Sequence, residues 1–311
     1  MPGPTFRDLM GRLACAASLG LLASPGQAQD WSGRLYEGEV PGGQGWDQPP
    51  VIHREGGQEA RYNTVDPKVE VYLPDPAEAT GAAVVMLPGG GLRVLGVGED
   101  TRTTIARFLE EGIAVILSEY RTLQLSPREI DAASAPRPID APPMRFPKLE
   151  TRNANANPAP GNAALGDVLR LAVLDGQQAL RLARGRAAEW NIDPDRIGMI
   201  GTSAGGGVAF GAMLASEAGA SPDFIVSIYG PALQDVTVPE EAPPLFLVTE
   251  TPHGPVTDGL LALAQMWKDS EQPVELHMYD VPNFSMRVTL WGDRLFDWMR
   301  ERKFLPPDKS E

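Results

Sequence analysis

The stretch that decides the fold is Ile197-Gly198-Met199-Ile200-Gly201-Thr202-Ser203-Ala204-Gly205-Gly206-Gly207. It begins as a short apolar run, continues as Gly-x-Ser-x-Gly centred on Ser203, and leads into a helical pattern over residues 208–215. A strand, a sharp turn and a helix in this order form a nucleophile elbow. Gly201 and Gly205 lack Cβ atoms where backbone segments must crowd together. The stretch therefore predicts that Ser203 occupies a strained turn between a buried strand and a helix.

Short apolar runs and helical patterns alternate on both sides of this elbow. Strands are expected at residues 69–73, 82–87, 113–117, 224–229, 245–248 and 274–279, and helices at residues 101–111, 167–190, 258–268 and 291–300. Such alternation is typical of an α/β fold with a mainly parallel sheet and helices on both faces. No internal repeat interrupts it, so we expect a single domain over residues 29–311.

Two segments break the alternation. Residues 29–66 are rich in Gly, Pro and Trp, and we expect an irregular N-terminal segment laid over the body of the domain. Residues 122–162 are rich in Pro, Ala and Asn and leave from a strand end, where α/β sheets place their ligands. Two interpretations of residues 122–162 stay open, a lid-like insertion over a site or a disordered surface insertion.

The first 28 residues have the pattern of a secretory signal peptide. Arg7 and Arg12 precede a short apolar run over residues 13–23, and Gly26-Gln27-Ala28 resembles a cleavage site. The only cysteine lies within this leader, so disulfides and thiol chemistry are excluded from the mature chain. No later apolar run is long enough to span a membrane. We therefore expect a periplasmic or secreted protein.

Charge and motif content exclude several classes of function. The 311 residues carry a net charge of −14, which disfavours nucleic acid and anionic membranes as partners. The glycine turn at residues 88–92 is not followed by Gly-Lys-Ser/Thr, so it is not a phosphate loop. No cluster of His and Asp has metal-ligand spacing, so we expect neither a metal nor another cofactor.

Three motifs in order carry a family resemblance. They are Pro-Gly-Gly-Gly at 88–91, Ala-Glu-Trp-Asn-Ile-Asp-Pro-Asp-Arg-Ile-Gly at 188–198 and Gly-Thr-Ser-Ala-Gly-Gly at 201–206, supported by Glu-Tyr-Arg at 119–121. With them the chain resembles α/β-hydrolases of the acetyl-xylan esterase-like (BD-FAE, endo-1,4-β-xylanase B-like) group. The resemblance implies the α/β-hydrolase fold and hydrolysis of esters, typically acetyl groups on plant polysaccharides. The expected partner is therefore a small-molecule or saccharide ester.

The glycine turn fits a second part of ester chemistry. Acyl transfer develops negative charge on the carbonyl oxygen, and backbone N–H groups aimed at that oxygen stabilise it by roughly 3 kcal/mol each. Gly90 and Gly91 allow such close approach, and Ala204 follows the nucleophile directly. These three residues are the expected oxyanion hole, although a plain glycine-rich turn at the end of a strand would give the same pattern at 90 and 91.

The partners of Ser203 depart from the family pattern. The resemblance implies a histidine in the turn after the last strand, where this chain has Asn283, whose amide cannot accept a proton near neutral pH. It implies an acid after the preceding strand, where this chain has His253 at or beside the position. Both loops thus differ from those of an ordinary serine triad.

The chain has three histidines. His53 belongs to the N-terminal segment, and we expect it to have a surface or structural role. His277 belongs to a predicted strand, and we expect it to have a structural role. His253 lies in a loop at the catalytic edge of the sheet and is the candidate for a displaced general base. The candidates for the acid that orients it are Glu250, Asp258 and Asp280.

Two hypotheses follow. In the first, the chain is an exported serine esterase that uses Ser203 and a displaced base. In the second, it is a catalytically inactive relative that binds a saccharide or a protein, because loss of the base costs about a million-fold in turnover. Trp31, Trp46 and Trp291 are able to stack on sugars in either case, although single tryptophans more often belong to a core.

Overall fold

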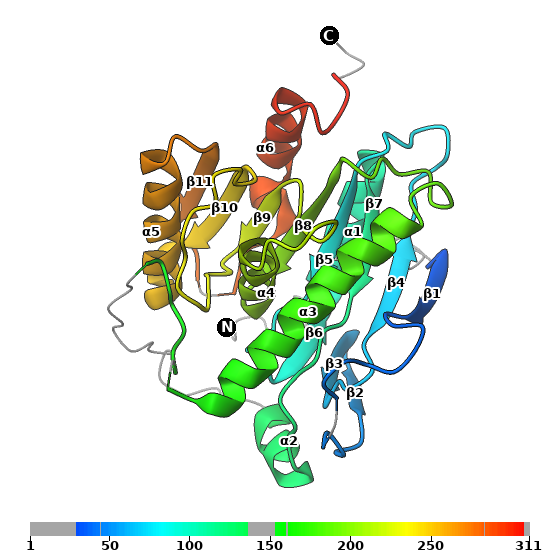
Figure 1. Cartoon of the computed structure of the whole chain (residues 1–311), viewed down its shortest axis with the longest axis vertical. Coiled ribbons are helices and arrows are strands. Elements are labelled where there is room, and N and C mark those ends of the chain that lie inside the picture. The colour runs from blue at the N-terminus through cyan, green and yellow to red at the C-terminus, as the bar shows by residue number, and fades with distance from the viewer. Residues whose placement is uncertain (1–28, 44, 136–152, 160, 283, 308–311) are drawn as a thin grey trace, which may run out of the picture.

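The computed structural model describes residues 29–43, 45–135, 153–159, 161–282 and 284–307. Its centre is an eight-stranded sheet (Figure 1). In order across the sheet, the strands are β1 (Trp31–Arg34), β4 (Lys68–Tyr72), β7 (Ala114–Ser118), β5 (Ala83–Leu87), β8 (Ile197–Thr202), β9 (Ile225–Ile228), β10 (Leu245–Glu250) and β11 (Val274–Tyr279). Strand β4 runs antiparallel to both β1 and β7, and the strands from β7 to β11 are parallel. The predicted mainly parallel sheet is confirmed.

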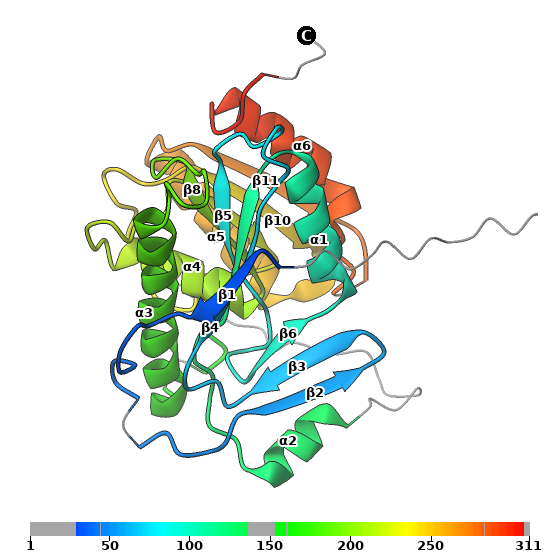
Figure 2. The same cartoon turned by 90° about the vertical axis from the view of Figure 1, so that its right-hand side faces the viewer.

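Helices cover both faces of this sheet (Figure 2). Helices α3 (Ala163–Gly185), α4 (Ala204–Leu214) and α5 (Pro255–Asp269) pack on one face. Helices α1 (Glu99–Glu110) and α6 (Val288–Glu301) pack on the other. Strands β5 and β7 are buried at every position, because a strand covered on both faces needs apolar side chains throughout. Among the described residues, no helix is long and apolar enough to cross a membrane.

The expectation of an irregular segment over residues 29–66 is wrong. This segment contains β1, β2 (Val51–Glu55) and β3 (Gln58–Tyr62), and the last two join β6 (Val94–Val97) in a separate antiparallel sheet. Gly56 and Gly57 form the hairpin turn with φ of 54° and 80°. Two adjacent positive φ angles match the right-handed twist of a hairpin, which is the physical reason for this structure. The four-residue strand β6, directly after the glycine turn, was also not predicted.

Residues 122–162 are only partly described, and they contain regular structure. Ser126 caps the N-terminus of helix α2 (Pro127–Ser134). Its side chain accepts the N–H of Glu129, while the Glu129 carboxylate accepts the N–H of Ser126. Further along, the N–H of Ala156 donates to Ala232 O at 2.9 Å, so residues 153–159 are attached to the loop after β9. Residues 136–152 lie outside the described part of the chain, as does the predicted signal peptide at 1–28.

A buried ion pair fastens the N-terminal segment to the domain. Arg121 and Asp175 are both fully buried, with Arg121 Nη2 2.8 Å from Asp175 Oδ1. The hydroxyl of Tyr36 donates to the same carboxylate oxygen at 2.8 Å, and Arg121 Nη1 donates to Pro41 O. Because each buried charge has several partners, this cluster joins α3, the end of β7 and the segment after β1.

Candidate active site

Ser203 lies between β8 and α4 with φ of 51° and ψ of −122°. A serine rarely adopts this backbone conformation, which costs on the order of 1–3 kcal/mol and persists where surrounding structure enforces it. Two contacts enforce it here. The N–H of Ser203 donates to Ile228 O at 3.0 Å, and a Cβ atom at Gly205 would lie 2.2 Å from Leu87 O. The elbow therefore needs a glycine at 205 to bring α4 against the end of β5.

The glycine turn of residues 88–92 lies beside this elbow. Gly90 has φ of 139°, and a Cβ atom there would lie 1.8 Å from Val94 O. The carbonyl of Gly90 accepts N–H groups from Arg93 and Val94 at 3.0 and 3.2 Å. Because a peptide unit is planar and trans, the N–H of Gly91 points away from these donors. Ala204 is the first residue of α4, so its N–H has no partner within the helix.

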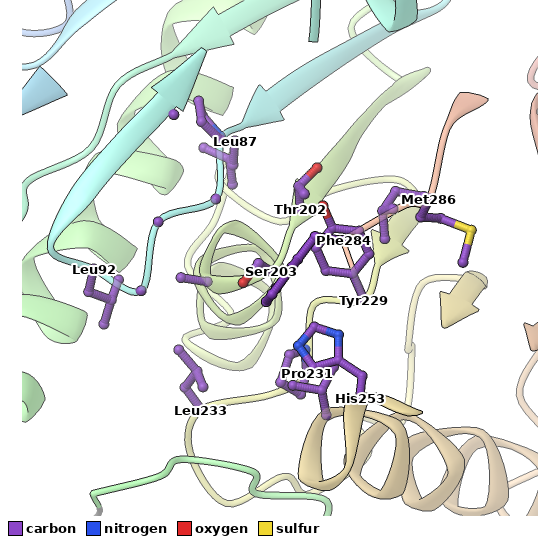
Figure 3. A pocket seen from close by; sticks show the side chains of 18 of the residues that line it. Leu87, Leu92, Thr202, Ser203, Tyr229, Pro231, Leu233, His253, Phe284 and Met286 are labelled. Carbon is purple, nitrogen blue, oxygen red and sulfur yellow. The ribbon is translucent and has the colours of Figure 1, made fainter. Parts of the chain in front are cut away.

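A single cavity of about 680 Å³ connects these elements (Figure 3). The residues that line it include Gly90, Gly91, Ser203, Ala204, Tyr229 and His253. The rest is mainly apolar and includes Leu92, Pro231, Leu233, Phe284 and Met286. A large apolar cavity with a few converging polar groups is the usual form of a small-molecule site.

His253 enters this cavity from the connection between β10 and α5. It is the last residue of the 3₁₀-helix η1 (Thr251–His253) and is 2% exposed. Figure 3 shows the His253 ring pointing from the start of α5 towards Ser203. Its Nδ1 atom lies 2.9 Å from Oε1 of Glu250, a fully buried carboxylate at the end of β10. The structure thus brings Ser203, His253 and Glu250 to one site.

Aromatic rings enclose the imidazole. The Phe284 ring meets it edge to face with centroids 4.9 Å apart, and the Tyr229 ring lies 5.6 Å away. Burial lowers the pKa of His253 from 6.5 to about 4, so the ring is neutral at neutral pH. Burial raises the pKa of Glu250, an effect opposed by the N–H groups of Phe284 and Ser285. The N–H of Phe284 donates to Glu250 Oε1 at 2.6 Å.

The other carboxylate candidates have different surroundings. Asp258 is exposed in the first turn of α5. Asp280 accepts a hydrogen bond from the hydroxyl of Thr251 at 2.9 Å. Asn283, at the position where the family resemblance implies a histidine, lies outside the described residues. Glu250 is the candidate that the structure places at contact distance from the imidazole.

The remaining histidines lie on other strands. His53 on β2 has its Nδ1 atom 3.0 Å from the hydroxyl of Ser134. His277 on β11 has its Nε2 atom 2.7 Å from Glu275 Oε1. Neither residue lines the cavity that contains Ser203. The roles expected for these two histidines stay predictions.

Two of the three tryptophans proposed for sugar stacking pack against the protein. The Trp31 ring lies 5.6 Å from the Trp190 ring and beneath the guanidinium of Arg186. Trp46 is partly buried against the core. Trp291 lines the cavity but is only 2% exposed. Among the described residues no group of three or more His, Cys, Asp or Glu is arranged to hold a metal.

Sequence reasoning missed Tyr229 and Phe284. Tyr229 follows β9 with a positive φ of 37°, and burial raises the pKa of its hydroxyl to about 12, so it remains a neutral phenol. A large aromatic residue directly after a buried strand was the available signal for Tyr229. Phe284 stands next to Asn283 in the loop where the resemblance implies the base. These two rings define how His253 is held.

Comparison with known proteins agrees with the fold. The sequence pattern of the alpha/beta hydrolase fold family matches residues 166–245, which include the elbow. No curated protein matches the chain in sequence. The structure is similar to an acetyl ester-xyloside bifunctional hydrolase from Caldicellulosiruptor lactoaceticus, with 18% identity, a TM-score of 0.58, and coverage of 89% of this chain and 98% of that one.

Two further similar structures are esterases. One is the thermophilic esterase Est2 from Thermogutta terrifontis, with 17% identity, a TM-score of 0.55, and coverage of 87% of this chain and 96% of that one. Another is the carboxylesterase Cest-2923 from Lactobacillus plantarum, with 12% identity, a TM-score of 0.54, and coverage of 84% and 99%. The chain therefore has the α/β hydrolase fold.

Proposed function

We propose that the chain is an exported carboxylic ester hydrolase in which Ser203 is the nucleophile, His253 the general base and Glu250 the acid that orients the imidazole. The observation that carries the proposal is the position of His253. It lines the same cavity as Ser203, and its Nδ1 atom lies 2.9 Å from Glu250 Oε1. A carboxylate on one imidazole nitrogen leaves the other nitrogen to accept the serine proton.

The reaction follows from these positions. The Ser203 oxygen attacks the ester carbonyl carbon while its proton passes to Nε2 of His253. The carbonyl π electrons move to the oxygen, where the N–H groups of Gly90, Gly91 and Ala204 stabilise the negative charge. Collapse of this intermediate breaks the bond to the alcohol, which takes the proton from His253. Water then attacks the acyl-serine by the same route and releases the acid and Ser203.

The cavity supports an ester with substituents on both sides of its carbonyl. Leu87 and Leu92 belong to the core on the α3 side of the sheet, whereas Met86 and Met286 belong to the core on the α1 side. All four line the same cavity, so it spans the edge of the sheet on either side of Ser203. One side therefore suits an acyl group and the other an alcohol. We propose a saccharide as that alcohol, because one similar structure is an acetyl ester-xyloside hydrolase.

Hydrolysis of p-nitrophenyl acetate by the purified chain tests the proposal. We expect turnover that is abolished in Ser203→Ala and falls by at least about 1,000-fold in His253→Ala. His53→Ala removes a half-buried histidine on the small sheet that does not line the cavity, and it serves as the matched control, with unchanged turnover expected. If the wild-type chain shows no turnover that depends on Ser203, it is not a serine esterase. The second hypothesis, a catalytically inactive relative that binds a saccharide or a protein, is then favoured.

A further inference from the structure

Tyr120 reaches the glycine turn from the neighbouring strand connection. It follows β7 by two residues and is 0% exposed. Its hydroxyl donates to Pro88 O at 2.6 Å. Burial raises the pKa of this hydroxyl, so it keeps its proton and remains a donor. A buried phenol thus holds the first carbonyl after β5, where the turn towards Gly90 and Gly91 begins.

The carbonyl groups of the turn are held by donors on the side away from the proposed oxyanion site. The pairs are Tyr120 hydroxyl with Pro88 O, Gly96 N–H with Gly89 O at 3.0 Å, Arg93 N–H with Gly90 O at 3.0 Å, and Leu123 N–H with Leu92 O at 2.8 Å. In a planar trans peptide the carbonyl and the following N–H point in opposite directions. Holding the carbonyls of Gly89 and Gly90 therefore aims the N–H groups of Gly90 and Gly91 the other way.

The Pro88 carbonyl also touches the elbow. A Cβ atom at Gly205 would lie 2.8 Å from Pro88 O, so this oxygen rests against the first turn of α4. That turn begins with Ala204, which carries the other proposed oxyanion donor. The position of the Pro88 peptide therefore sets the spacing between the donors of the glycine turn and the donor of the elbow.

Loss of the Tyr120 hydroxyl would leave a buried carbonyl without this donor. An unsatisfied buried carbonyl is costly, so the Pro88 peptide would turn to find another partner. Such a rotation would move the start of the glycine turn relative to Ala204. Oxyanion donors are effective only when their N–H groups meet the oxygen at hydrogen-bond distance, so small displacements reduce the rate.

We propose that Tyr120 is a positioning residue for the oxyanion hole, acting through the Pro88 carbonyl. The proposal rests on the proposed function, because an oxyanion hole matters only if Ser203 performs acyl transfer. Tyr120 is then a further residue, besides the proposed nucleophile, base and acid, that affects the rate. Its effect is on stabilisation of the transition state and not on substrate binding.

Tyr120→Phe tests this role because it removes the hydroxyl and keeps the ring. We expect kcat to fall by about 10-fold to 100-fold while KM changes by less than about 2-fold, as for loss of an interaction made in the transition state. The inhibition constant of a trifluoromethyl ketone, which forms an oxyanion on Ser203, is expected to rise by the same factor. The inhibition constant of the corresponding secondary alcohol, which forms none, is expected to stay unchanged.

Tyr72→Phe is the matched control. It removes another tyrosine hydroxyl, which donates to Glu70 at 2.8 Å on β4, a strand that is not paired with β5. We expect unchanged kcat and unchanged inhibition constants for both inhibitors. Wild-type kcat in Tyr120→Phe, or an equal loss of affinity for both inhibitors, would overturn the role of Tyr120. A wild-type chain without Ser203-dependent turnover would overturn the proposed function, and the role of Tyr120 with it.

Discussion

His253 and Glu250 face one another within a single connection, with Nδ1 of the imidazole 2.9 Å from Oε1 of the carboxylate. The 3₁₀-helix η1 explains this arrangement, because three residues per turn bring positions i and i+3 to the same side. The proposed acid is therefore the last residue of β10, and the proposed base lies in the turn directly after it. The loop after β11, where the resemblance implies the base, instead gives the N–H of Phe284 to Glu250.

Replacement of Glu250 by Gln tests whether this carboxylate orients the base. We expect kcat to fall by about 100-fold to 10,000-fold with KM nearly unchanged, because an amide no longer fixes the imidazole tautomer or stabilises its protonated form. Steady-state kinetics on p-nitrophenyl acetate measures both constants. Asp258→Asn, an exposed change in the first turn of α5, is the control. If Asp258→Asn lost activity and Glu250→Gln did not, the acid would be Asp258.

The pH dependence of kcat/KM follows from the burial of His253. A general base works only when neutral, so activity falls as pH falls through its pKa, which burial lowers from 6.5 to about 4. Glu250 faces the same ring, and its own pKa is raised by burial, so the pair titrates together in acid. We expect constant kcat/KM from pH 8 down to about pH 6, with the loss below that. An acidic limb centred at pH 6.5 or above would contradict a buried, neutral base.

The elbow requires glycine at 205 for steric reasons. Gly205→Ala places a Cβ atom 2.2 Å from Leu87 O, a backbone atom of β5 that cannot move without shifting the strand. We expect a loss of at least about 2 kcal/mol in the free energy of unfolding, measured by urea denaturation. Gly166→Ala on the exposed side of α3, where nothing lies within 4 Å of the added carbon, is the control. We expect the free energy of unfolding of Gly166→Ala to rise by about 0.5–1 kcal/mol, because alanine has the higher helix propensity. Equal effects of the two substitutions would contradict the packing argument.

The buried ion pair between Arg121 and Asp175 should dominate the attachment of the N-terminal segment. Asp175→Asn leaves a fully buried guanidinium without its opposite charge, so we expect a loss of about 3–5 kcal/mol in the free energy of unfolding. Asp66→Asn breaks an ion pair with Arg34 in which both side chains are exposed, and should cost less than about 1 kcal/mol. Urea denaturation of both variants compares the two losses. Similar losses would show that burial of the pair is unimportant.

The sequence predicted the parts of the fold that depend on local pattern. Continuous apolar runs identified β5 and β7, and the glycines around Ser203 identified the elbow. The small sheet was missed because β2 and β3 are half exposed and carry little apolar pattern, although the Gly56-Gly57 turn was a signal for a hairpin. Helix α2 was missed because it has eight residues, too few to establish a period.

The site was predicted only in part, for a physical reason. Ser203, Gly90 and Gly91 were recognisable because strand-end turns with glycine have a local signature. The relation between Glu250 and His253 depends on the 3₁₀-turn that follows β10, and Thr251-Pro252 indicated a turn without fixing its type. The hydrogen bond from Tyr120 to Pro88 joins residues 32 positions apart on neighbouring strands, so no local pattern contains it.

The most direct test of the central claim is the second-order rate of labelling of Ser203 by a fluorophosphonate, measured by mass spectrometry at neutral pH. We predict that the wild-type chain and His53→Ala are labelled at Ser203 at equal rates. We also predict that His253→Ala is labelled at least about 100-fold more slowly, because the serine has lost its base. Equal rates in wild type and His253→Ala, or no labelling of wild-type Ser203, would contradict the account.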